Sequence, residues 1–231
     1  MNFAQGEVLL VDKPLHWTSF DVVNKIRHAL RRNYGKLKVG HAGTLDPLAT
    51  GLLIICTGKF TKQIDTYQAQ EKEYTGTLRL GATTASLDAE MPIEQTFPIA
   101  HITTEMLASA TLPFIGDIEQ IPPIYSAIKV EGQTAHIVAR KGKKLELKPR
   151  AVSIAAFELT TIAIPDISFR VVCSKGTYIR SLVRDYGTAL HSGAYLTALC
   201  RTRIGTYLLA DAWQLDALIE NISRQPAPPS A

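Results

Sequence analysis

The strongest constraint on the fold is a change of hydrophobic period within residues 166–190. Up to residue 174 the side chains alternate, because Ile167, Phe169, Val171 and Cys173 are interleaved with Ser168, Arg170, Val172 and Ser174. A period of two predicts a half-buried strand. Beyond Gly176 the apolar residues recur at helical spacing, at Ile179, Leu182, Val183, Tyr186 and Leu190. A strand followed directly by an amphipathic helix indicates a mixed fold.

Strands and helices are mixed along the whole chain without a regular βαβ order. Strands are predicted at 7–12, 52–56, 72–80 and 195–203, and a hairpin at 147–160 and 166–174. Helices are predicted at 19–32, where Thr18 and Asp21 form a capping box, and at 103–112, 134–140 and 211–222, the last capped by Asp211. The fold class is therefore α+β. We expect one domain with a lobe inserted between residues 81 and 150.

Composition excludes several classes of protein. The 231 residues are 46% hydrophobic and 20% charged, which is typical of a globular protein with a substantial core. No run of 18 apolar residues predicts a transmembrane helix, and the N-terminus does not resemble a secretory signal. The three cysteines lie far apart, so we expect free thiols and a cytoplasmic protein. Neither CxxC nor HExxH occurs, so no metal site is expected.

Positive charge is concentrated in two runs. Residues 24–38 carry six Lys or Arg and no acid, and residues 140–150 carry six with one Glu. Either run alone is more simply read as a solvated surface. Two such runs in one chain favour a polyanionic partner, because clustered cations bind phosphates with release of counterions.

Asp46 is the only acidic residue between Asp21 and Asp65, a region with eight Lys and Arg. It precedes Pro47, which favours an extended conformation at Asp46, and the segment around it is rich in glycine. On spacing alone, a structural Asp-Pro turn is favoured over a catalytic carboxylate.

A second candidate site is "KGTYIR", residues 175–180, where Tyr178 and Arg180 begin a helix. The N-terminus of a helix attracts anions. Such an arginine is usually solvated or salt-bridged locally, and a functional role requires a partner such as Asp46. Further on, Leu199 and Arg201 share one face of a predicted strand, where a core leucine beside a surface arginine is the ordinary interpretation.

The string "GHAGTLDPLATGLL" resembles the central motif of the TruB family of tRNA pseudouridine synthases. Five further segments resemble family motifs in family order, over about residues 7–207: "LLVDKPLHWTS", "KEYTGTLRLG", "PPIYSAIKVEGQTAHIVARKG", "SKGTYIRSLVRDYG" and "ALCRTRIG". The resemblance implies the pseudouridine synthase fold, in which helices and loops flank a mixed, largely antiparallel central sheet.

The resemblance also implies roles for individual residues. Asp46 would be the catalytic aspartate, Tyr74 would stack on the target base, and Arg180 would pair with Asp46. The remaining substrate-binding residues would be Tyr178 beside Arg180, Leu199 in the wall of the base pocket, His41 where the base leaves the RNA stack, and Lys13 with Pro14 supporting the Asp46 loop.

The chain departs from the family pattern in three places. His16 stands where the family usually has Gly, which puts the geometry of that loop in question, and Ala42 stands where Thr is common. Many members continue into a C-terminal PUA domain. Here we expect a catalytic domain over residues 1–223, a disordered tail over 224–231, and no full PUA domain.

By resemblance, the function is isomerisation of a T-loop uridine, at position 55 of tRNA, to pseudouridine. The implied partner is the T-arm of tRNA, bound by a monomer without cofactor, metal or membrane. One alternative is a non-catalytic tRNA-folding chaperone that uses the same surface. A guide-RNA-dependent synthase subunit is another. The residues do not choose between attack at C6, attack at C1′ and proton removal at C2′.

Overall fold

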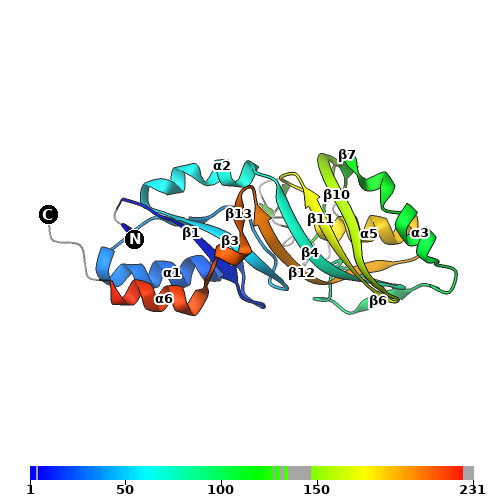
Figure 1. Ribbon diagram of the computed structural model, residues 1–231, viewed down its shortest axis with the longest axis horizontal. Coiled ribbons are helices and arrows are strands. Elements are labelled where there is room, and N and C mark those ends of the chain that lie inside the picture. Colours follow the sequence, from blue (N-terminus) through cyan, green and yellow to red (C-terminus); the bar gives the residue numbers. More distant parts are fainter. Residues whose placement is uncertain (4, 127, 131–132, 135–146, 226–231) are drawn as a thin grey trace. The chain divides into compact units, whose positions relative to one another are not determined.

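The computed structural model describes residues 1–3, 5–126, 128–130, 133–134 and 147–225. The chain divides into two compact units (Figure 1). Unit 1 comprises Met1–Tyr74 and Leu199–Ala231, and unit 2 comprises Thr75–Ala198. The chain leaves unit 1 within strand β4 (Lys72–Leu80) and returns within β12 (Ala194–Ile204).

Unit 1 is built on the buried strand β3 (Ala49–Thr57). Strand β1 (Val8–Lys13) runs antiparallel to β3, from the pair Val8–Cys56 to the pair Lys13–Gly51. β2 (Val39–His41) pairs antiparallel with one end of β3, and residues 199–201 of β12 pair parallel with its other end. The short strands β13 (Tyr207–Leu208) and β14 (Trp213–Gln214) pair with β12 and β1 respectively.

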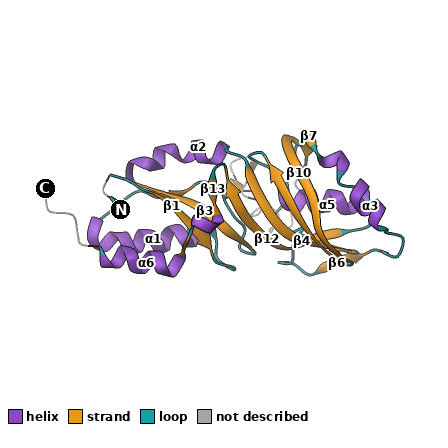
Figure 2. Ribbon diagram, viewed as in Figure 1, coloured by secondary structure: helices purple, strands orange, loops and turns teal. Residues whose placement is uncertain are grey.

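Helices α1 (Ser19–Tyr34) and α6 (Leu215–Arg224) lie side by side in unit 1 (Figures 1 and 2). They bury their apolar stripes in a core that contains Val22, Ile26, Leu53 and Leu218. A second cluster, which includes Ile54 and Tyr67, packs with η1 (Gly58–Gln63) and α2 (Ile64–Ala69). β3 contributes alternate side chains to each cluster, which explains its continuous apolar sequence.

Unit 2 contains the antiparallel strands β7 (Gly116–Gln120), β10 (Arg150–Ala163) and β11 (Asp166–Cys173), with β4 next to β11. Phe157 on β10 makes edge contacts with Phe169 and Tyr186, and Tyr186 lies on helix α5 (Ile179–Ala189). The smaller elements are α3 (Thr104–Ser109), η2 (Leu112–Phe114), and the hairpins β5 (Ala82–Thr84) with β6 (Ile93–Thr96) and β8 (Lys129–Val130) with β9 (Gln133–Thr134).

The α+β prediction is confirmed. The predicted hairpin is β10 and β11, and the helix predicted after Gly176 is α5. The capping box is also confirmed, since Thr18 Oγ1 accepts from Asp21 N at 3.0 Å and Thr18 N donates to Asp21 Oδ2 at 2.9 Å. The prediction that Asp211 caps the last helix was wrong. It ends the turn η3 (Leu209–Asp211), β14 follows, and Gln214 precedes α6.

The predicted helix at 134–140, most of the basic run at 140–150 and the tail from 226 lie outside the described residues. In the part of the chain that is described, no helix is both long and apolar enough to span a bilayer. Cys56, Cys173 and Cys200 are free thiols, as predicted.

Replacement of Gly51 by Ala should strongly destabilise unit 1. Gly51 has φ 99°, and an added Cβ would lie 2.7 Å from the backbone nitrogen of Arg201. Gly176 is a matched control, because it has φ 90° but no heavy atom within 4 Å of such a Cβ. Gly176→Ala should lower the free energy of unfolding by about 1–2 kcal/mol through backbone strain. Gly51→Ala should lower it by about 2–5 kcal/mol, because overpacking against Arg201 adds to the same strain. Urea unfolding measures both, and equal losses would contradict the close approach.

Candidate active site

Asp46 lies on a tight turn between β2 and β3. The Asp46 carbonyl accepts from Ala49 N at 3.0 Å, and Pro47 occupies the second position of the turn, where its restricted φ is favoured. The Pro47 carbonyl accepts from His16 N at 2.8 Å. The Asp46 turn is therefore tied to the loop that precedes α1.

His16 adopts φ 66°, the left-handed conformation that a glycine at this position would adopt without strain. The turn geometry is kept despite the departure from the family pattern. Ala42, the second departure, is fully buried in the core of unit 1, and its backbone N donates to Ile54 O at 2.9 Å. A methyl group suits that apolar environment.

Ser19 fixes the residue before Asp46. Its buried hydroxyl accepts from Leu45 N at 2.8 Å and lies 3.3 Å from Leu45 O, to which it donates. We did not identify Ser19 from the sequence, where it appeared only as the first residue of a helix. Its signals were its place directly after the capping Thr18 and at the end of the motif "LLVDKPLHWTS".

Lys13 is buried at the end of β1, where its ammonium donates to Pro14 O at 2.9 Å and to Trp17 O at 2.5 Å. Burial lowers the pKa of Lys13 to about 8, and the nearby Asp46 carboxylate opposes this shift. The ammonium thus interacts electrostatically with Asp46 while it holds the 14–17 loop. This geometry agrees with the supporting role that the family resemblance implies.

The prediction that Arg201 is a surface residue beside a core leucine was wrong. Arg201 is only 1% exposed, whereas Leu199 is half-buried. The guanidinium donates from Nε to Leu52 O at 2.8 Å and from Nη2 to Gly43 O at 3.3 Å. The parallel pairing of Arg201 with Gly51, which has no side chain, allows this close approach. Arg201 therefore braces both ends of the Asp46 loop.

Three other predicted residues of unit 1 have defined surroundings. His41 lies on β2, and burial lowers the pKa of its imidazole, with a smaller contribution in the same direction from the Arg201 charge. His41 is therefore mainly neutral at pH 7. Tyr74 is buried on β4, as the alternation of that strand predicted. Leu199 pairs with Ala49, three residues after Asp46.

Unit 2 holds Tyr178 and Arg180 at the start of α5. The backbone N of Tyr178 donates to Gln120 Oε1 at 2.7 Å. The Arg180 guanidinium donates to Ser86 O and Tyr125 O, both at 2.9 Å, and lies 3.4 Å from Asp88 Oδ2. The side chains of Arg180 and Asp88 are each 6% exposed. The ordinary interpretation, a solvated arginine in the first helical turn, is therefore wrong.

Asp88 is a further residue that sequence reasoning missed, because no motif or spacing singled it out. Its carboxylate also accepts from Glu90 N at 3.0 Å. Each unit thus holds a pre-formed charged cluster: Asp46 with Lys13 and Arg201 in unit 1, and Arg180 with Asp88 in unit 2. The pairing of Asp46 with Arg180 stays a prediction.

Comparison with known proteins gives a consistent result. Residues 31–179 match the family model described as TruB family pseudouridylate synthase (N terminal domain). The tRNA pseudouridine synthase B of Phocaeicola vulgatus is 56% identical over 227 residues, which cover 97% of each chain.

Two solved structures have a similar fold. A Cbf5–Nop10–Gar1 complex matches with a TM-score of 0.72 and 28% identity over 94% of this chain and 55% of that chain. An H/ACA ribonucleoprotein bound to a substrate RNA that contains 2′-deoxyuridine matches with a TM-score of 0.69 and 26% identity, over 94% of this chain and 53% of that one. The present chain spans about half the length of these solved relatives.

The buried Arg180–Asp88 pair predicts a large stability loss for Asp88→Asn. This change keeps the shape of the side chain but removes its negative charge, so the buried Arg180 guanidinium loses its charged partner. The free energy of unfolding should fall by about 3–5 kcal/mol. Asp166→Asn is the matched control, because the Arg79–Asp166 bridge of 2.7 Å is exposed, with side chains 45% and 39% accessible. The control should cost at most about 1 kcal/mol. Unfolding in urea compares the two, and similar losses would contradict a buried pair.

Lys13 predicts a distinctive pH dependence of stability. Its pKa is about 8 in the folded chain and 10.5 when the side chain is fully solvated, so the unfolded chain binds the extra proton between these values. The free energy of unfolding should therefore rise with pH in this window, by about 2–3 kcal/mol from pH 7 to pH 10 relative to Lys13→Met. The contributions of the other titrating groups to the pH dependence cancel when the two stability curves are subtracted. Parallel stability curves would contradict the assignment.

Proposed function

The chain belongs to the TruB family of pseudouridylate synthases, which are isomerases, and we propose that it converts the T-loop uridine at position 55 of tRNA to pseudouridine. The family assignment and the tRNA synthase relatives support pseudouridine formation in tRNA. The T-loop position and the residue roles below are our proposal.

The observation that carries the proposal is the rigid presentation of Asp46. A reactive carboxylate must be held in one direction while the rest of the site moves around the substrate. Hydrogen bonds to His16, Ser19 and Arg201 hold the segment 43–47 that carries Asp46. The Lys13 ammonium adds an electrostatic interaction with Asp46. The positive charges of Lys13 and Arg201 favour the ionised form of the carboxylate, which either a nucleophile or a base requires.

The reaction exchanges one bond for another within a single nucleotide. The C1′–N1 bond of uridine breaks, the uracil rotates, C1′ bonds to C5, the proton on C5 leaves and N1 gains a proton. Asp46 acts as nucleophile at C1′ or C6 or as base at C2′, and each route needs only one carboxylate close to the sugar. No redox step occurs, and the proposal assigns no cofactor.

The target base must leave the RNA stack before Asp46 can reach it. We assign Tyr74 to stack on the flipped base, which is worth about 1–3 kcal/mol. Arg180 pairs with Asp46, Tyr178 lies beside it, Leu199 walls the base pocket and His41 faces the site from which the base departs. A neutral His41 suits contact with a nucleobase better than contact with a phosphate.

The proposed partner is the T-arm of tRNA, bound by one copy of the chain in the cytoplasm. Some of the cations in the basic run at 24–38 bind the RNA backbone, and one solved relative carries a bound substrate RNA, which supports an RNA substrate. A tRNA-folding chaperone on the same surface is the alternative. Activity on naked tRNA separates a stand-alone synthase from a guide-dependent subunit.

Asp46→Asn should abolish catalysis and leave RNA binding within about twofold of wild type. Loss of the reactive carboxylate should lower the rate by about 10³-fold or more. Release of tritium from C5-labelled uridine in T-arm RNA measures turnover, and fluorescence anisotropy measures the Kd.

Asp65→Asn is the control for the loss of one negative charge, since Asp65 is exposed on α2 in the same unit. It should retain full turnover. Normal tritium release by Asp46→Asn would refute the proposed role. If wild-type protein binds tRNA but releases no tritium, the chaperone alternative is favoured.

A further inference from the structure

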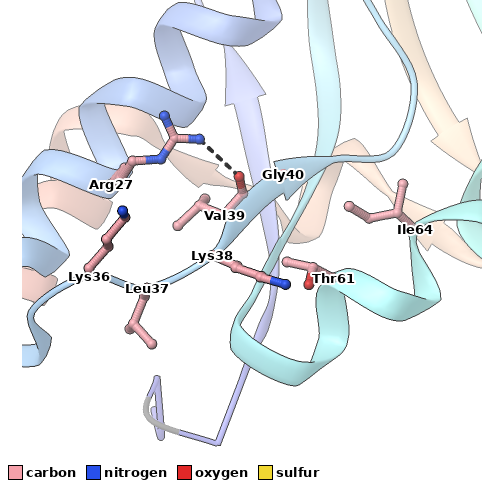
Figure 3. A pocket seen from close by; sticks show the side chains of 8 residues that line it. All are labelled: Arg27, Lys36, Leu37, Lys38, Val39, Gly40, Thr61 and Ile64. Atoms are coloured by element: carbon pink, nitrogen blue, oxygen red, sulfur yellow. Dashed lines mark hydrogen bonds between the residues drawn. The ribbon is translucent and has the colours of Figure 1, made fainter.

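Unit 1 carries a pocket of about 510 Å³ apart from the Asp46 turn (Figure 3). This volume falls within the range of about 300–1,000 Å³ for small-ligand pockets. It lies between α1, the turn after α1, β2 and the segment η1–α2. The lining residues are Arg27, Lys36, Leu37, Lys38, Val39, Gly40, Thr61 and Ile64.

Arg27 is a fixed cation in the wall of this pocket. Its guanidinium donates from Nη1 to Asn24 Oδ1 at 2.8 Å and from Nη2 to Val39 O at 3.1 Å, the bond drawn in Figure 3. The same group lies over the ring of Phe20, 5.9 Å from its centroid. An arginine oriented in this way loses little conformational entropy when it binds an anion.

Lys36 and Lys38 add two cations on the turn between α1 and β2. In Figure 3 the Lys36 side chain lies near Arg27, and the Lys38 side chain extends toward Thr61. Leu37, between them, packs against the core of unit 1 and so fixes the turn. None of the described lining residues is acidic.

The rest of the lining is apolar. Leu37, Val39 and Ile64 provide this surface, and Gly40 allows Ile64 to approach, because a Cβ on residue 40 would lie 2.8 Å from Ile64 Cδ1. Cations beside an apolar surface match two of the three parts of a nucleotide, its phosphate and its ribose. The adjoining turn η1 adds Lys59 and Lys62, against one acid, Asp65.

We propose that this pocket binds a phosphodiester of the tRNA substrate, with the phosphate at Arg27, Lys36 and Lys38 and the ribose against Leu37 and Ile64. The inference rests on the proposed function, because tRNA is the polyanion that such an enzyme must hold. The proposal assigns three of the six cations in the 24–38 run to this pocket. The other three, Lys25, Arg31 and Arg32, do not line it.

The test compares two double variants that lose the same charge. Lys36→Ala/Lys38→Ala removes both pocket lysines, and Arg31→Ala/Arg32→Ala removes two exposed cations from the last turn of α1. Anisotropy titrations with tRNA between 50 and 200 mM KCl give Kd and its salt dependence. The pocket variant should bind about tenfold more weakly at ~0.1 M salt, with a log–log salt slope reduced by about 0.7–0.9, as for one lost phosphate contact. The control should change by less than about twofold.

Tritium release separates this inference from the proposed function. At saturating tRNA the pocket variant should keep the wild-type kcat, and Lys36→Arg/Lys38→Arg should restore the Kd. If the wild type is active but the two double variants bind tRNA equally well, the proposal that the pocket binds tRNA is overturned and the proposed function stands. A pocket that binds an acidic protein instead of tRNA would give this result. An inactive wild type would overturn the function, and the binding comparison would still test the pocket.

Discussion

A buried arginine holds the loop on which the proposed chemistry depends. Arg201 reaches from β12 to the carbonyls of Gly43 and Leu52, and so spans the start and the end of the segment that carries Asp46. The contact exists because β12 runs parallel to β3 and meets it at Gly51, where a side chain would collide with the Arg201 backbone. A charge is costly to bury unless it is hydrogen-bonded. These two carbonyls offset part of that cost and tie the loop geometry to the sheet.

Lys13 complements Arg201 at the same loop. Both are buried, and the Arg201 charge is one reason that the pKa values of Lys13 and His41 are depressed. Asp46 has the opposite effect on Lys13 and so stabilises the cluster. The same field favours the ionised carboxylate that the proposed mechanism requires. In that mechanism, structural support and reactivity depend on the same charges.

Unit 2 contains a comparable arrangement around a buried cation. There Arg180 is held by the Asp88 carboxylate and by the carbonyls of Ser86 and Tyr125. Gln120 binds the start of the adjoining helix through the backbone N of Tyr178. Each of these two clusters is therefore organised by its own hydrogen bonds and charges, and such preorganisation lowers the reorganisation cost of a chemical step. The proposed phosphate pocket beside α1 follows the same principle, with one oriented arginine beside two lysines.

Local pattern was sufficient to predict several strands and helices of this chain. The alternation before Gly176, the helical spacing after it and the Thr18–Asp21 capping box depend on neighbours along the chain, so they were predicted correctly. The motif around Asp46 and the order of the other motifs indicated the family. The surroundings of Arg201, Asp88 and Ser19 were not predictable in this way. Their partners Gly43, Arg180 and Leu45 lie 158, 92 and 26 positions away. Only the folded sheet brings them into contact, and burial then turns an apparently solvated arginine and aspartate into fixed parts of the site.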